Sequence, residues 1–355
     1  MRKKYIAAGI VTAGIITLLS VSIVFTTNMA KQLGKIDSKI DKAIGITEDI
    51  AQEDDVIIAS EYKIKSTKEL SDAYVNGTVE KLKSEDKETI DMADKILKEI
   101  TKDNMTNYEK ELAVYQWMIK NIKIDESGMA AVQKQKEALS TPNGVLKNQK
   151  AVCVGYATTF RLFMQMMKID CKVVHSMDLS HSWNEVKLED DWYFVDAYSD
   201  VNSENFANFN LNDEMCLESY EWNREFFPAA AGVKYNYACM NNQKETDVYK
   251  IPKRVRKVID DKSENLFLNL GKNMSDETKD IVEAMMSSIE DYTMDSVMIS
   301  YKWVENDEQE RILCIYATPE ATEDMENLSE EVAKKVRKAV NKAFEDYSNP
   351  DDIDE

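Results

Sequence analysis

The apolar pattern of residues 153–198 changes from helical spacing to three short extended runs, and this change is the strongest constraint on the fold. Apolar residues that recur every three or four positions predict a helix over 153–167 with one buried face. Runs rich in β-branched and aromatic residues predict strands over 171–177, 181–188 and 192–198. Consecutive strands after a helix predict a helix packed on an antiparallel sheet, so we place the chain in the α+β class.

The N-terminal region predicts a membrane anchor. An uncharged, mostly apolar run from Tyr5 to Thr27 follows the basic start MRKK, and about twenty such residues span a bilayer as a helix. We predict a cytoplasmic stub and an uncleaved signal anchor over residues 1–30. The positive-inside rule then places residues 31–355 on the extracytoplasmic side of a single-pass cell-membrane protein. A cleaved signal peptide and a buried core helix are the alternatives.

The rest of the chain divides by composition into a stalk and two domains. Residues 31–60 are polar and predict a juxtamembrane stalk, residues 61–250 a main domain, and residues 251–355 a small C-terminal α/β domain with an acidic tail. In the main domain, TPNG at 141–144 is a turn signal, and residues 200–250 are expected to be irregular. Helices are predicted over 67–83, 87–100, a segment after Asn107, a basic segment from Pro252, 276–292 and 328–347, with a hairpin over 297–317.

Charge and residue counts exclude several functions. The net charge of −20 over 355 residues repels phosphate backbones, so nucleic acid is not an expected partner. The five cysteines form no CxxC pair and their number is odd, so at least one thiol is expected to be free. His175 and His181 are the only histidines, which disfavours a zinc site. No metal or cofactor is predicted.

Cys153 is the candidate nucleophile because it lies where a loop becomes a helix. The unpaired N–H groups of a first helical turn and the helix dipole stabilise a thiolate there. Gly155 is expected to leave room near the sulfur. For the cysteine alone, the competing interpretation is a small apolar residue at the start of a core helix.

His181 and Asp196 are predicted to meet on neighbouring strands. A tight turn at Glu189–Asp190 would pair Leu188 with Asp191, which sets Asp196 opposite Trp183. His181 would then be the diagonal neighbour of Asp196 on the same face, within reach of its carboxylate. A register shifted by one residue would move Asp196 to the other face.

These residue types predict acyl transfer through a thiol. Cys153 would attack a carbonyl carbon, His181 would form the imidazolium partner, and Asp196 would fix the imidazole. The backbone N–H of Cys153 would bind the oxyanion, and no second donor is evident in the sequence. The rival imidazole, His175 in VVHSM, is interpreted as a structural histidine.

The run from Asn107 to Tyr198 resembles the transglutaminase-like domain superfamily, which is related to papain-like cysteine proteases. The matching segments are ELAVYQWMIKNIKID, TPNGVLKNQKAVCVGYA, KIDCKVVHS, SHSWNEVKL and DWYFVDAYSD. Carried onto this chain, the family's triad falls on Cys153, His181 and Asp196, in a nucleophile helix packed on an antiparallel sheet within residues 61–250. One departure is Ala151, where many members have glycine.

The resemblance implies a thiol hydrolase of peptide or amide bonds with a protein or peptide substrate. Two alternatives stay open: a protein-glutamine acyltransferase that cross-links proteins, and a non-catalytic surface module that binds other material. The oligomeric state is not predicted.

Overall fold

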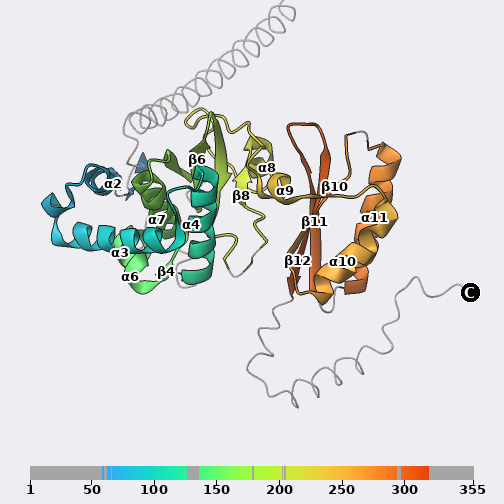
Figure 1. Cartoon of the computed structure of the whole chain (residues 1–355), viewed down its shortest axis with the longest axis horizontal. Helices are drawn as coiled ribbons and strands as arrows, with labels where there is room; N and C mark the ends of the chain where they lie inside the picture. Colours follow the sequence, from blue (N-terminus) through green and yellow to red (C-terminus); the bar gives the residue numbers. More distant parts are fainter. Residues whose placement is uncertain are drawn as a thin grey trace, which may run out of the picture. The chain divides into compact units, whose positions relative to one another are not determined.

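The computed structural model describes residues 58–59, 62–64, 66–125, 136–177, 180–201, 203, 205–272, 274–293 and 297–319. The chain divides into two compact units, residues 1–240 and 241–355 (Figure 1). The predicted anchor, nearly all of the predicted stalk, the helix over 328–347 and the acidic tail lie outside the described residues. Among the helices that are described, none has the length and apolar character needed to cross a bilayer.

The first unit begins with helices that bury one stripe each. In α3 (Ser84–Ile100) the buried residues Ile90, Ala93 and Leu97 follow helical spacing. The next helix, α4 (Asn107–Asn121), starts with a capping box, in which Thr106 and Glu109 satisfy each other's backbone N–H groups. The predicted helix over 67–83 is shorter in the structure. The observed helix is α2 (Lys68–Val75), which stops there because Gly77 takes a positive φ of 65° and a 3-10 turn (Val79–Lys81) follows.

The TPNG segment was predicted as a turn, and that prediction was wrong. Thr141 accepts a hydrogen bond from the N–H of Gly144 and thereby caps α6 (Pro142–Asn148). Pro142 fits the first helical turn because no intrahelical partner is needed for its missing N–H. A short helix, α5 (Glu137–Ser140), precedes it.

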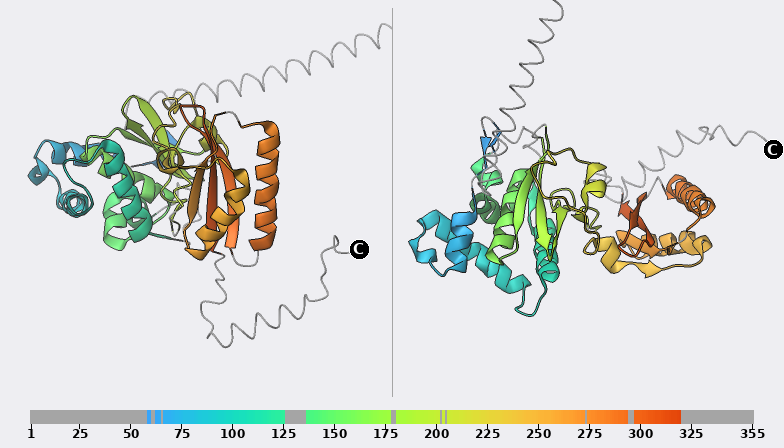
Figure 2. Two further views of the ribbon diagram at one scale, coloured as in Figure 1. Left: turned by 45° about the vertical axis from the view of Figure 1, so that its right-hand side comes forward. Right: turned by 90° about the horizontal axis from the view of Figure 1, so that it is seen from above.

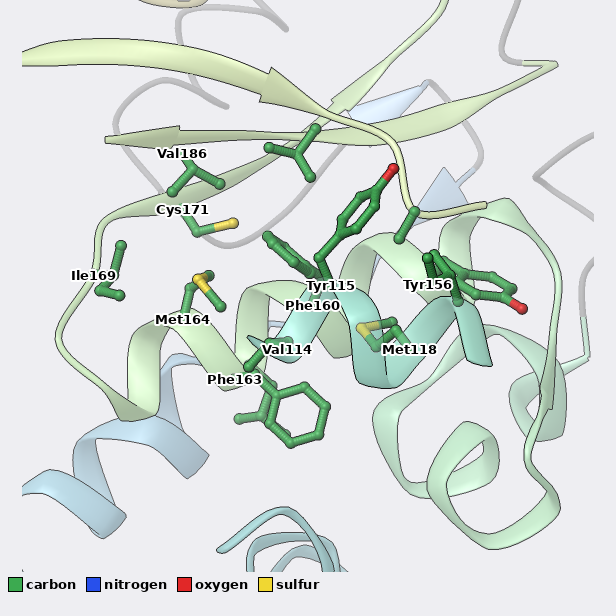
Figure 3. Packing of buried hydrophobic residues seen from close by; sticks show 14 of the residues in the cluster. Val114, Tyr115, Met118, Tyr156, Phe160, Phe163, Met164, Ile169, Cys171 and Val186 are labelled. Carbon is green, nitrogen blue, oxygen red and sulfur yellow. The ribbon is translucent and has the colours of Figure 1, made fainter. Parts of the chain in front are cut away.

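Helix α7 (Cys153–Met166) is buried on almost every side, and of its fourteen residues only Gln165 is not buried. Tyr156, Phe160, Phe163 and Met164 pack into a large apolar cluster with residues of α4 and of the sheet (Figure 3). A helix surrounded in this way is held in place by packing along its whole length, so its first residue is fixed relative to the sheet.

The main sheet has the order β5-β6-β7-β8, and every neighbouring pair is antiparallel. The predicted pairing of Leu188 with Asp191 is confirmed, and the Glu189 φ of 55° fits a two-residue hairpin turn. One face of this sheet packs on α7, while Trp183, Phe194 and Trp222 form an apolar cluster on another. The strands are β5 (Cys171–His175), β6 (Ser182–Leu188), β7 (Asp191–Val195) and β8 (Phe209–Leu211).

Residues 200–250 were expected to be irregular, and most of the segment is. It nevertheless contributes β8, the short helices α8 (Asp213–Leu217) and α9 (Tyr237–Asn241), a short strand described below and a 3-10 turn (Val248–Lys250). Short strand pairs complete the unit: β1 (Ile58–Ala59) with β2 (Tyr62–Lys63), and β3 (Lys123–Ile124) with β4 (Lys150–Ala151).

The second unit is a sheet of order β11-β12-β10-β9 with two helices packed against it (Figure 2). The predicted hairpin is present as β11 (Val297–Glu305) and β12 (Arg311–Pro319). The predicted helices are α10 (Ile251–Asp260) and α11 (Asp276–Thr293). Sequence reasoning missed β9 (Gln243–Lys244) and β10 (Asn265–Asn269). Because β9 pairs with β10, this unit begins about ten residues before the predicted boundary at 250/251.

Candidate active site

Cys153 is the first residue of α7, as predicted. The preceding residue, Val152, is extended and provides no side-chain cap to the helix. The Cys153 side chain packs with Val152, Ile64 and Val173. Only 8% of the residue is exposed.

Gly155 has a different role from the expected one. We expected it to leave room near the sulfur, but its Cα faces the preceding backbone. A Cβ at this position would lie 2.1 Å from the Leu139 carbonyl oxygen and 3.0 Å from the Ala151 Cβ. The glycine therefore allows the start of α7 to approach the chain segments before it, and this contact sets where Cys153 lies.

The structure brings His181 and Asp196 together. His181 Nε2 lies 2.7 Å from Asp196 Oδ2, and the side chains are 18% and 3% exposed respectively. His181 precedes β6 and Asp196 follows β7, so the confirmed hairpin register carries both residues to one end of the same strand pair. The predicted diagonal contact across the hairpin is therefore present.

The sulfur of Cys153 completes the group through the same imidazole. The Cys153 side chain acts on the charge of the His181 ring, whose Nε2 faces the Asp196 carboxylate. Burial opposes the charged imidazolium, but the Asp196 carboxylate and the Cys153 sulfur outweigh it and raise the pKa of His181 to about 10. The imidazole is therefore protonated at neutral pH.

Asp196 is kept ionised by its neighbours. Burial tends to raise its pKa, yet the charge and hydrogen bond of His181, together with hydrogen bonds from Ser199 and Tyr220, lower the pKa below the usual value. Oδ1 accepts the backbone N–H groups of Tyr198 (3.0 Å) and Ser199 (3.2 Å). Oδ2 accepts the hydroxyls of Ser199 (2.7 Å) and Tyr220 (2.6 Å).

The rival imidazole, His175, has a structural environment. It is 8% exposed, and its Nδ1 lies 2.8 Å from the Ser182 hydroxyl. Burial and the nearby Arg161 guanidinium lower the pKa of His175 to about 3, so this ring stays neutral. These contacts agree with its interpretation as a structural histidine.

Two residues of the site were missed by sequence reasoning. Ser199 follows Asp196 by three residues, a spacing that commonly places a hydroxyl near a preceding carboxylate in a turn, so a local signal existed. Tyr220 had none. It belongs to the irregular segment after α8 and reaches Asp196 only through the tertiary fold.

A cysteine at the start of a buried helix, facing a histidine and an aspartate on an antiparallel sheet, defines a transglutaminase-like arrangement. The sequence model of the transglutaminase-like superfamily matches residues 94–197, a range that holds all three side chains. The chain therefore contains a transglutaminase-like domain.

Two curated relatives match the chain at low identity. The human kyphoscoliosis peptidase is 26% identical over 118 residues, which cover 29% of this chain, and the mouse protein of the same name is 26% identical over 116 residues. The match spans 17% of the length of each relative. A crystal structure of a TGase is 22% identical, covers 37% of each chain and has a TM-score of 0.29.

Proposed function

We propose that this chain is a thiol hydrolase of peptide or amide bonds that acts through Cys153, His181 and Asp196. The observation that carries the proposal is the 2.7 Å contact of His181 Nε2 with Asp196 Oδ2, in a ring whose charge is also favoured by Cys153 at the start of α7. A protonated imidazole beside a thiol at a helix N-terminus favours a thiolate–imidazolium pair, which is the reactive form of a catalytic cysteine. The transglutaminase-like domain and the peptidase name of the matched relatives support the same reaction class.

The steps follow from the positions of these groups. The Cys153 thiolate attacks the substrate carbonyl carbon, and the negative charge that develops on the oxygen is stabilised by the backbone N–H of Cys153. His181 then gives its proton to the leaving amine, which departs and leaves a thioester on Cys153. Neutral His181 next takes a proton from water, and the hydroxide attacks the thioester. The C–S bond then breaks, the acid is released, and the Cys153 thiolate is left beside a His181 imidazolium that holds the proton from water, while Asp196 stays ionised throughout.

We further propose that residues 1–30 anchor the chain in the cell membrane and that the domain acts on extracytoplasmic protein or peptide. The support is the apolar run after MRKK and the positive-inside rule. Protease added to intact cells should remove the domain if this orientation is right. Protection of the domain until the membrane is opened would contradict it.

Thiol labelling tests the triad without a known substrate. Cys153 is buried and Cys239 is partly exposed, so exposure alone predicts faster alkylation of Cys239. Iodoacetamide should instead label Cys153 about tenfold faster than Cys239, because a thiol beside a protonated imidazole is the reactive one. His181→Ala should abolish the difference, and His175→Ala is the matched control that should keep it. Faster labelling of Cys239 in the wild-type chain would refute the proposal.

The acceptor decides between hydrolysis and acyl transfer, and the acyltransferase remains the alternative. A fluorescent primary amine offered with a glutamine-containing protein would become attached to that protein by a transferase, whereas a hydrolase releases ammonia or cleaves the chain. A non-catalytic binding module would show neither product and no preferential labelling of Cys153. Cys153→Ser serves as the inactive control in each assay.

A further inference from the structure

We infer that Tyr220 is a positioning residue that holds the His181–Asp196 pair through both its hydroxyl and its ring. Nothing in the family match points to it, because residue 220 lies beyond the matched range 94–197. The inference rests on the triad proposed above and extends it by one residue from the irregular segment that follows α8.

The hydroxyl of Tyr220 fixes the carboxylate. It donates to Asp196 Oδ2 at 2.6 Å, the same oxygen that faces His181 Nε2 at 2.7 Å. The Ser199 hydroxyl lies 3.0 Å from the Tyr220 oxygen and donates to that same carboxylate oxygen. A carboxylate with these donors on Oδ2 and two backbone N–H groups on Oδ1 cannot rotate without breaking charge-assisted hydrogen bonds. Asp196 Oδ2 is thereby aimed at the imidazole.

The ring of Tyr220 covers the imidazole face. The two rings are stacked, with centroids 5.2 Å apart and an interplanar angle of 19°. Trp183 stacks on Tyr220 in turn, at 4.7 Å and 23°. An aromatic face within about 6 Å of a cation attracts it, so this stacking favours the imidazolium over the neutral ring. The ring also keeps water from one side of the His181–Asp196 hydrogen bond.

Tyr220 itself is held firmly by its segment. Its backbone N–H donates to the Cys216 carbonyl at 2.9 Å, and the next residue, Glu221, accepts the N–H of Met177 at 2.9 Å. Trp222 packs edge-on against Phe194 of β7 at 4.7 Å. The segment is therefore tied both to α8 and to the chain just before His181, which lets it determine the position of the Tyr220 side chain.

The two histidines make a direct test possible by nuclear magnetic resonance. The chain carries only His175 and His181, so histidine labelled with nitrogen-15 gives two sets of ring signals from the 355-residue protein in detergent micelles. His175 is an internal reference, because its lowered pKa keeps it neutral from pH 5 to 9. No turnover is needed, so this result stands apart from whether the chain is a hydrolase.

Removing the hydroxyl alone is the first variant. In Tyr220→Phe the carboxylate loses a charge-assisted hydrogen bond, so the His181 Nε2 proton should exchange with water about tenfold faster. The matched control is Tyr235→Phe, which removes a hydroxyl that donates to the Glu189 carboxylate, also at 2.6 Å but at an exposed site. That control should leave the exchange rate unchanged. An exchange rate in Tyr220→Phe within twofold of the wild-type rate would overturn the positioning role.

Removing the ring as well is the second variant. Tyr220→Leu should also lower the pKa of His181 by roughly one unit, because the stacked aromatic face is lost, while Tyr220→Phe should keep the pKa close to the wild-type value. A merely structural role would change the midpoint of thermal unfolding in both variants without this difference. Equal His181 pKa values in Tyr220→Leu and Tyr220→Phe would refute the role of the ring, and the exchange measurement decides separately on the hydroxyl.

Discussion

The two units differ in what they bury. The first unit encloses ionisable side chains such as Glu111, Arg161, Glu185, Asp196 and Asp200, each at most 3% exposed. Among the described residues of the second unit, the buried polar side chains are Glu245 and Asn269. Its core is otherwise apolar, with Val255, Leu268 and Val282 at its centre.

This difference indicates where the chemistry resides. Burying a charge costs several kcal/mol unless partners compensate, so a fold retains buried charges mainly where they are used or fully paired. In the first unit, Asp196 lies just beyond the end of β7 and contacts His181, which precedes β6. The second unit instead has a groove of about 860 Å³ between α10 and α11, with apolar residues such as Val255, Ile259 and Ile281 in its lining. The buried charges are therefore concentrated in the unit that holds the candidate triad, whereas the second unit packs mainly through apolar side chains.

The largest expected effect would break the first unit and spare the second. Gly155→Ala places a methyl group against the Leu139 carbonyl, where a Cβ would lie at 2.1 Å, so the start of α7 must shift. We expect the first unit to lose about 3 kcal/mol or more of stability. Hydrogen exchange read by mass spectrometry should show lost protection in α7 and unchanged protection in β10.

The matched control is Gly77→Ala, whose φ of 65° strains a side chain but which has open space around it. It should cost only about 1–2 kcal/mol. Equal destabilisation by the two substitutions would mean that close packing at the start of α7 has no special weight.

The next effect concerns the charge balance of the triad. Asp196→Asn removes the carboxylate that raises the pKa of His181, and burial, which lowers that pKa, remains. The His181 imidazole should then be neutral at pH 6, so Cys153 loses its cationic partner. Iodoacetamide labelling of Cys153 should therefore fall about a hundredfold at that pH. In the wild-type chain the His181 imidazolium should persist until the pH approaches 10. Unchanged labelling of Asp196→Asn at pH 6 would show that Asp196 does not support the imidazolium.

The sequence was sufficient for this part of the site because local rules determine it. A two-residue turn at Glu189–Asp190 fixes the β6–β7 register, and the two-residue period of strands then decides which side chains share a face. Cys153 was predictable from the onset of helical spacing. The same locality explains the confirmed hairpin of β11 and β12.

The sequence was insufficient where tertiary contacts decide. Tyr220 lies 24 residues from Asp196, in a segment without periodicity, so no pattern indicates that its hydroxyl reaches the carboxylate. The packing role of Gly155 depends on the Leu139 backbone, which comes from a different helix. Residues 141–144 show the limit of turn signals, since Thr-Pro is equally suited to a helix N-terminus, and here α6 starts there.

A third effect uses pH to sharpen the contrast in buried charge. Burial raises the pKa of Glu185 to about 8, with the Lys172 ammonium opposing this, so the folded state holds a proton that the unfolded state releases near pH 4.5. This group therefore contributes stability below about pH 4.5, and the contribution is lost as pH rises through 8. The first unit should become less stable between pH 5 and 8, on the order of 3 kcal/mol from this group.

Glu185→Gln should remove that pH dependence of stability. The difference in stability between the variant and the wild type isolates the Glu185 carboxyl from Asp196, whose lowered pKa makes stability rise with pH instead. Amide exchange in β6 at pH 5 and pH 8 is the measurement, with β12 as the internal reference. A variant that becomes as unstable at pH 8 as the wild type would contradict a buried, proton-holding Glu185.

The smallest effect separates exposed from half-buried ion pairs. Arg256 and Asp260 of α10 are joined at 2.8 Å with side chains 73% and 55% exposed. Lys150 and Asp125 of the first unit are joined at 3.0 Å, but the Asp125 side chain is only 11% exposed. Exposed pairs contribute about 0.3 kcal/mol to stability and are screened by salt, whereas removing the cation beside a covered aspartate costs about 1 kcal/mol.

Arg256→Ala should therefore cause only a small loss of amide protection in α10, and only at low salt. Lys150→Ala should instead weaken the β3–β4 pair at every salt concentration. Equal and salt-sensitive losses for both variants would mean that the contrast between the units is confined to the groups around the triad, and that the periphery of the first unit behaves like any solvated surface.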